Sequence, residues 1–119
     1  VWNKFLLSPI EFAAYIDSLQ SPWVRAYFDV GNILPYGYPQ HWIRTLGSRI
    51  VRVHIKGFDV ERKAFTYLME GSVDWPSVMA ALRDAGYDHT LTAELPVDAG
   101  NPLGRLRAIS MDMDKILAL

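Results

Sequence analysis

The chain has 119 residues, no cysteine and a formal net charge of −1 at pH 7. This length suits one domain with a sizeable core, and the lack of cysteine excludes disulfides and thiolate metal sites. The charge balance provides no broad basic face for nucleic acid, and no apolar run reaches the ~18 residues of a membrane span. We therefore expect a protein of the cytoplasm, a reducing compartment, that binds neither nucleic acid nor membrane.

The first predicted elements are a strand stub at Val1-Trp2 and a helix. The segment Ser8-Pro9-Ile10-Glu11 is a capping box, with Ser8 at the N-cap and Pro9 at the first helical position. The helix is predicted to end near Leu19 and to bury an apolar face made of Ile10, Ala13, Ala14 and Ile16. Because the chain starts without methionine and inside the strand pattern, we expect it to be a piece of a longer protein.

Three strands and three helices then alternate. The strands are short β-branched or aromatic runs, predicted at residues 25–29, 50–54 and 90–94. The helices are predicted from Pro39 to Gly47, from Asp74 to Gly86 and from Asn101 onwards, since caps and prolines open them and glycines end the first two. Their apolar faces are predicted from the spacing: Trp42, Ile43 and Leu46; Val78, Ala81, Leu82 and Ala85; and Leu103, Leu106, Ile109, Met113 and Ile116.

Alternation of this kind predicts parallel strands joined by right-handed crossovers. The segment from Phe58 to Gly71 is predicted as a loop over the strand ends. Four βα units are too few for a (β/α)₈ barrel, which needs roughly 250 residues, so residues 1–119 are either half of a barrel or a small open α/β sheet. The start inside a strand favours the half-barrel. Its two unpaired sheet edges favour self-association, and hence a homo-oligomer.

Three candidate metal ligands stand at the ends of the predicted strands: Asp29, His54 and Glu94. Since the carboxyl ends of parallel strands meet at one edge, these side chains should converge. Two carboxylates and an imidazole suit one divalent ion, Mn²⁺, Mg²⁺, Co²⁺ or Zn²⁺. Both carboxylates should lie within ~6 Å of a His54 ring nitrogen, since bonds between a metal ion and its ligands are only ~2–2.6 Å long. The alternative is three local roles, with Asp29 capping a turn, His54 bonded to backbone and Glu94 paired with arginine.

Four segments carry a resemblance to a known family: residues 1–9, Tyr27-Phe28-Asp29-Val30-Gly31-Asn32, Val53-His54-Ile55-Lys56-Gly57-Phe58 and Gly71-Ser72-Val73-Asp74-Trp75-Pro76. They resemble the xylose isomerase-like TIM-barrel superfamily, and within it the sugar phosphate isomerase/epimerase group. The resemblance implies that the chain is the C-terminal half of the barrel, strands 5–8, and that an N-terminal half-barrel completes it.

In that family one divalent metal is held by Glu, Asp, His and Glu from strands 5 to 8. The last three match Asp29, His54 and Glu94, and the first glutamate would precede Val1. The resemblance implies a sugar or sugar-phosphate isomerase or epimerase that works by proton transfer through an enediolate, with Glu94 as one of two acid/base glutamates. Without the first glutamate, the chain alone is expected to be inactive.

Substrate contacts are expected at Asn32, Lys56 and Asn3. Many ketose epimerases of the family carry histidine where Asn32 stands, and asparagine still hydrogen-bonds a hydroxyl but does not titrate near neutral pH. Lys56 lies on the same strand face as His54 and either reaches a substrate oxygen or phosphate or is a solvated charge. Two alternative functions remain: an inosose dehydratase-like lyase of the same fold, and a non-catalytic carbohydrate-binding fragment.

Overall fold

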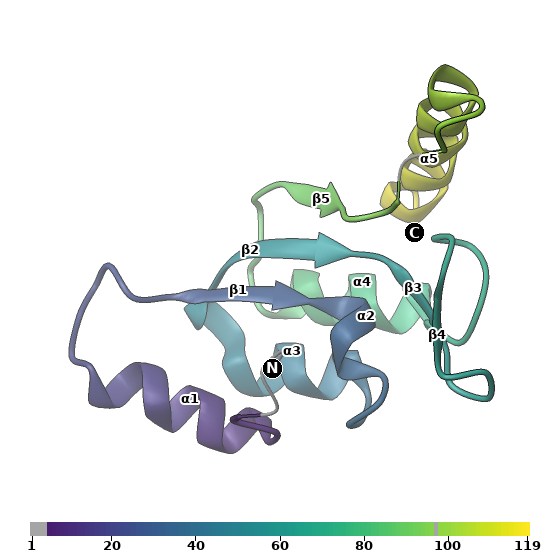
Figure 1. Ribbon diagram of the computed structural model, residues 1–119. Helices are drawn as coiled ribbons and strands as arrows, with labels where there is room; N and C mark the ends of the chain where they lie inside the picture. Colours follow the sequence, from purple (N-terminus) through teal and green to yellow (C-terminus); the bar gives the residue numbers. More distant parts are fainter. Residues whose placement is uncertain (1–4, 97) are drawn as a thin grey trace.

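A computed structural model describes residues 5–96 and 98–119 (Figure 1). The predicted strand at Val1-Trp2 and the predicted substrate contact Asn3 lie outside the described residues. The helices are α1 (Pro9–Ser18), α2 (Val30–Ile33), α3 (Pro39–Leu46), α4 (Trp75–Asp84) and α5 (Pro102–Leu117), and the 3₁₀ turn η1 (Gly47–Arg49) follows α3. The strands are β1 (Ala26–Asp29), β2 (Ile50–Ile55), β3 (Gly57–Asp59), β4 (Ala64–Thr66) and β5 (Leu91–Ala93).

The central sheet has three parallel strands in the order β1-β2-β5. All three point the same way in Figure 1, so their carboxyl ends lie at one edge of the sheet. The prediction of parallel strands alternating with helices is therefore confirmed. The strand bounds differ from the predicted ones by one residue at most ends, as expected where neighbouring turns share the extended conformation.

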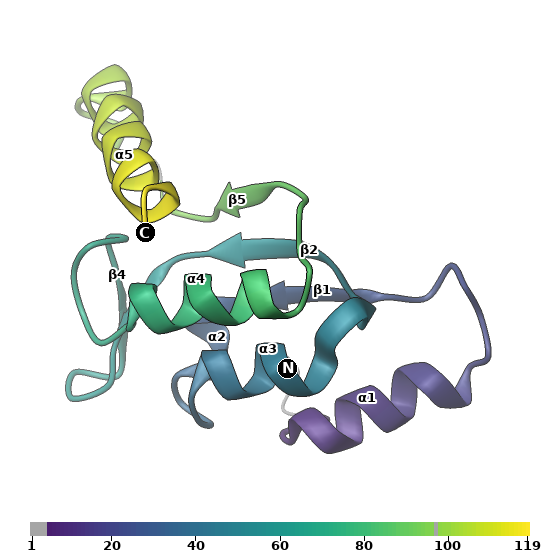
Figure 2. The same cartoon turned by 180° about the vertical axis from the view of Figure 1, so that it is seen from behind.

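Helices α3 and α4 pack against each other and cover one face of the sheet. They lie behind the strands in Figure 1 and in front of them in Figure 2. Side chains of β1 alternate accordingly, because Ala26 and Phe28 are buried whereas Tyr27 is exposed. The core combines this covered face with the predicted apolar faces of both helices, which are buried at Trp42, Ile43, Leu46, Val78, Ala81 and Leu82.

Helices α1 and α5 bury fewer of their apolar side chains than the sequence spacing predicts. In α1, Ile16 is buried but Ile10 is exposed. In α5, Leu103 and Leu106 are 70% and 62% exposed, whereas Ile116 is buried. The reason is the placement of α5, which rises away from the sheet after β5 and meets the core only towards its C-terminal end (Figure 1). Within the described residues, no helix has both the length and the apolar character needed to cross a membrane.

Two elements near the carboxyl ends of the strands were not predicted. The segment expected as a loop contains an antiparallel hairpin of β3 and β4. Its turn is held by Asp59, whose side chain accepts hydrogen bonds from the backbone N–H groups of Glu61 and Arg62. The rings of Phe58 and Phe65 meet edge to face across the two strands. Strands of three residues are too short to show an alternating pattern in a sequence. The other unpredicted element is α2, a single turn directly after β1.

Candidate metal centre

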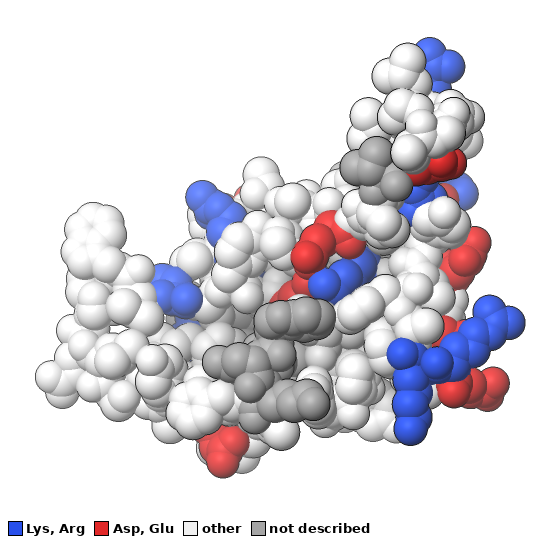
Figure 3. All heavy atoms as spheres, viewed as in Figure 1, with Lys and Arg blue, Asp and Glu red and all other residues white. Residues whose placement is uncertain are grey.

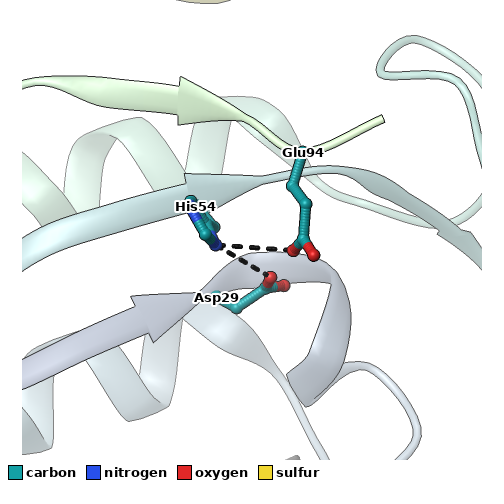
Figure 4. A group of neighbouring side chains, drawn as sticks. All are labelled: Asp29, His54 and Glu94. Carbon is teal, nitrogen blue, oxygen red and sulfur yellow. Dashed lines mark ion pairs between the residues drawn. The ribbon is translucent and has the colours of Figure 1, made fainter. Parts of the chain in front are cut away.

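Asp29, His54 and Glu94 converge at the carboxyl edge of the sheet (Figure 4). His54 Nδ1 lies 3.9 Å from Asp29 Oδ2 and 3.4 Å from Glu94 Oε2. One potential ligand atom from each residue lies within 4.8 Å of the other two. These distances satisfy the spacing expected from the sequence. A group of this size is able to surround one ion with modest side-chain adjustment.

The register of the strands explains the convergence. Asp29 is paired with His54 across β1 and β2, so their side chains leave the same sheet face side by side. On the other side His54 is paired with Thr92, and Glu94 stands two residues further along. Glu94 therefore projects from the same face as Thr92, and its longer side chain reaches back to His54. Its backbone N–H donates to Ile55 O at 3.0 Å, which fixes the point where Glu94 leaves the sheet.

Asp29 uses its two carboxylate oxygens differently. Oδ1 accepts a hydrogen bond from the backbone N–H of Asn32 at 2.8 Å and so caps α2. Oδ2 is buried and has no hydrogen-bond partner among the described residues, although it lies in ion-pair contact with Lys56 Nζ at 3.1 Å. A buried carboxylate oxygen without a hydrogen bond is costly unless a cation compensates it, and Oδ2 is the oxygen that faces His54.

Lys56 belongs to the same cluster. Its Nζ donates to Glu94 Oε2 at 2.7 Å, and only 7% of the residue is exposed, so it is not a solvated charge. The ammonium also lies 4.6 Å from the centre of the Phe65 ring on β4. Gly31 in α2 gives the lysine room, since a Cβ at that position would lie 2.6 Å from Lys56 Cγ and 2.9 Å from Lys56 O.

The two carboxylates differ in their acidity. Burial raises the pKa of Asp29 above its ordinary value, and burial is the largest cause. The hydrogen bond from Lys56 lowers the pKa of Glu94, which is half exposed. Glu94 is therefore the more readily ionised and the more accessible carboxylate, whereas Asp29 needs a compensating cation to stay ionised in its buried position.

His54 has a second partner that the sequence did not indicate. Tyr27 Oη lies 2.6 Å from His54 Nε2, the ring nitrogen on the side away from the carboxylates. The expected alternative, a histidine bonded to backbone, does not match this side-chain contact. Tyr27 stands two residues before Asp29 and so shares its strand face, which is the one signal in the sequence that links it to the site.

The cluster lines a pocket of about 270 Å³, whose walls also include Asn32 and Phe12. Asn32 was expected to contact substrate, and its side-chain Oδ1 is buried without a hydrogen-bond partner among the described residues. A second, more apolar pocket of about 690 Å³ shares Lys56 and Glu94 with the first and continues towards the hairpin. Acidic and basic side chains meet on this side of the molecule near the strand ends (Figure 3).

The donor set fits a divalent ion. Carboxylate oxygens and one imidazole nitrogen, without sulfur, are ligands of Mn²⁺, Mg²⁺, Co²⁺ and Zn²⁺. The Asp29 Oδ2 atom, which has no hydrogen-bond partner among the described residues, and the half-exposed Glu94 carboxylate both face His54 Nδ1, so each residue presents a potential ligand atom to the same small space. Three protein ligands leave positions open for water or substrate, as catalytic sites require.

Comparison with known proteins finds solved structures of similar fold. It is similar to the crystal structure of a xylose isomerase domain protein from Planctomyces limnophilus, with a TM-score of 0.73 and 19% identity over 94% of this chain and 45% of that one. It is similar to D-allulose 3-epimerase from Methylomonas sp., with a TM-score of 0.62 and 25% identity over 76% and 30%. It is also similar to an L-ribulose 3-epimerase, with a TM-score of 0.60 and 22% identity over 87% and 33%.

The chain thus spans less than half the length of each of these structures. No curated protein matches it significantly. The model of the xylose isomerase-like TIM-barrel family matches residues 1–114, nearly the whole chain, and agrees with the parallel βα units of the fold. The chain therefore belongs to the xylose isomerase-like TIM-barrel family.

Proposed function

We propose that the protein is a metal-dependent sugar or sugar-phosphate isomerase or epimerase, and that this chain carries three of its metal ligands. The observation that carries the proposal is the convergence of Asp29, His54 and Glu94 within 4.8 Å at the carboxyl edge of a parallel sheet of this family. The similarity to D-allulose and L-ribulose 3-epimerases supports a ketose as the substrate. The fourth ligand is the strand-5 glutamate that the family resemblance implies, and the N-terminal half of the barrel completes the fold.

When bound, the divalent ion makes the hydrogen next to a sugar carbonyl more acidic by drawing electron density from the carbonyl oxygen. Glu94 removes or returns that proton, since its carboxylate is ionised at neutral pH and exposed to the pocket. Asp29, His54 and Glu94 would hold the ion. Lys56 and Asn32 orient the substrate, because both line the pocket and offer a cationic donor and an amide.

The test is a calorimetric Mn²⁺ titration of the intact protein and its Asp29→Asn variant. Asparagine keeps an oxygen that accepts the Asn32 N–H but loses the charge, so the cap survives and the metal site does not. We expect Mn²⁺ binding by the wild type and at least a tenfold loss in the variant. Asp114→Asn on the exposed surface of α5 is the control and should bind like the wild type.

Substrate chemistry is tested next with a panel of ketoses and ketose phosphates in deuterated water. Proton transfer at carbon should place solvent deuterium on the carbon next to the carbonyl, as NMR detects. Loss of water from the sugar instead would favour the lyase alternative. Absence of Mn²⁺ binding by the wild type contradicts the proposal and favours a carbohydrate-binding role.

A further inference from the structure

The Tyr27 hydroxyl engages the side of His54 that faces away from the candidate metal ligands. The distance from Tyr27 Oη to His54 Nε2 is 2.6 Å, well within hydrogen-bond range. The two rings lie 4.3 Å apart between centroids, with their planes tilted by 50°. Nδ1, the other ring nitrogen, faces Asp29 and Glu94. Each nitrogen of the imidazole therefore has its own set of neighbours.

The strand register produces this contact without help from any loop. Tyr27 is paired with Arg52 on β2, and Asp29 with His54, so Tyr27 and His54 are diagonal neighbours on adjacent strands. Neighbouring strands are about 4.8 Å apart, which an aromatic side chain spans easily. Tyr27 is 53% exposed and thus does not belong to the packed core. Its hydroxyl is held by the histidine rather than by burial of the ring.

We propose that Tyr27 is a positioning residue that orients His54 for metal binding. The inference rests on the proposed function, because it requires that His54 binds a metal. A histidine that ligates through Nδ1 carries its proton on Nε2, and a partner that accepts this proton fixes both the tautomer and the ring orientation. The Tyr27 hydroxyl oxygen is that acceptor. Removal of such a partner typically weakens metal binding 10–100-fold.

A role in packing alone predicts a different result. Tyr27→Phe keeps the ring, its contact with the imidazole and its place on β1, and removes only the oxygen. If Tyr27 only packs against His54, the variant should bind metal like the wild type. If the hydroxyl orients the imidazole, the variant should bind metal more weakly although its fold is unchanged.

The experiment compares wild type, Tyr27→Phe and Tyr15→Phe in the intact protein. Tyr15 is exposed on α1, outside the pocket, and serves as the matched control. Mn²⁺ affinity is measured by calorimetry, and the protonation of the His54 ring by ¹⁵N–¹H correlation spectra of metal-free and Zn²⁺-loaded protein. We expect 10–100-fold weaker Mn²⁺ binding by Tyr27→Phe and loss of the exchange-protected Nε2–H signal of His54. Tyr15→Phe should match the wild type in both.

Unchanged Mn²⁺ affinity in Tyr27→Phe overturns the inference, and so does a His54 ring protonated on Nδ1 in the Zn²⁺-loaded wild type. In both cases wild-type metal binding persists, so the proposed function stands. A wild type that binds no Mn²⁺ overturns the proposed function and the positioning role together. The wild-type titration therefore separates the failure of the inference from the failure of the function.

Discussion

The two roles that the sequence offers for Asp29 as alternatives, helix cap and metal ligand, are compatible in the structure. One oxygen caps α2 and the other faces His54, so turn formation and ligand chemistry do not compete for the same atom. The cap also fixes the carboxylate, because the bond to the Asn32 N–H prevents rotation of the side chain away from the cluster. Local structure thus pre-orients a residue proposed to bind metal, which reduces the entropy cost of binding.

Lys56 places a positive charge between these two carboxylates. Its ammonium lies 2.7 Å from Glu94 Oε2 and 3.1 Å from Asp29 Oδ2, the oxygens proposed to bind the ion. Lys56→Met removes a charge that repels a cation, so we expect roughly tenfold tighter Mn²⁺ binding, which corresponds to about 1.4 kcal/mol. The metal-free variant should unfold at a lower temperature than the wild type, since two carboxylates then lose their nearest cation.

Calorimetry and thermal unfolding with and without Mn²⁺ check both effects. Lys115→Met is the control, because Lys115 pairs with Asp112 on α5 and lies outside the pocket. Weaker Mn²⁺ binding by Lys56→Met would show that the lysine supports the ion rather than repels it.

At the scale of elements, the sequence predicted the helix starts and strand ends, which depend on residues close together in the chain. The starts of α1, α3, α4 and α5 follow from their caps and prolines, and the three strand ends follow from the runs that precede Asp29, His54 and Glu94. The exposed face of α5 was not predictable, since apolar spacing tells which side chains share a face but not what covers it. The sequence did not indicate the role proposed for Tyr27, for a related reason. A strand pattern does not distinguish an aromatic residue that packs from one that orients a neighbouring histidine.

Helix α4 offers a test of capping, since the Asp74 side chain accepts a hydrogen bond from the backbone N–H of Ser77 at 3.1 Å. We expect Asp74→Ala to lower the free energy of unfolding by about 1 kcal/mol at pH 7. The bonds from Ser77 lower the pKa of Asp74 below its ordinary value of 3.8. Because the folded pKa is the lower one, the stabilisation is present above pH 3.8 and is lost as the pH falls through the folded value.

Urea unfolding at pH 7 and near pH 3, followed by tryptophan fluorescence, measures this difference. The difference in unfolding free energy between wild type and Asp74→Ala should be smaller at the lower pH. Asp88→Ala, in the exposed turn before β5, should change stability little at either pH. An equally large difference in unfolding free energy at low pH would mean that the uncharged carboxyl caps the helix as well as the carboxylate does.

At the scale of the whole molecule, one face of the sheet packs into the core and the other presents the candidate metal site. The covered face packs on α3 and α4, and the opposite face presents Tyr27, His54 and Glu94. Substitutions on the two faces should therefore have separable effects. Ile43→Ala in α3, where the side chain is fully buried, should cost about 2–5 kcal/mol of unfolding free energy and leave the Mn²⁺ affinity of the folded protein unchanged.

Denaturant unfolding and calorimetry on the same variant check this separation. Arg44→Ala, one residue further along the same helix, removes only an exposed contact with Asp84 and should cost under about 1 kcal/mol. A large change in Mn²⁺ affinity in Ile43→Ala would show that the two faces are mechanically coupled.

The central position of β2 also bears on how the chain reaches its folded state. Asp29 ends β1 and Glu94 directly follows β5, and both strands pair with β2. The two residues therefore meet only after two pairings between segments distant in the sequence have formed. Such non-local contacts are slow to form, and the ligand cluster is complete only when both are in place. An ion that needs all three side chains therefore finds no site in partly folded chains. Binding of the ion therefore slows unfolding and lengthens the lifetime of the folded protein, but it does not raise the rate of folding.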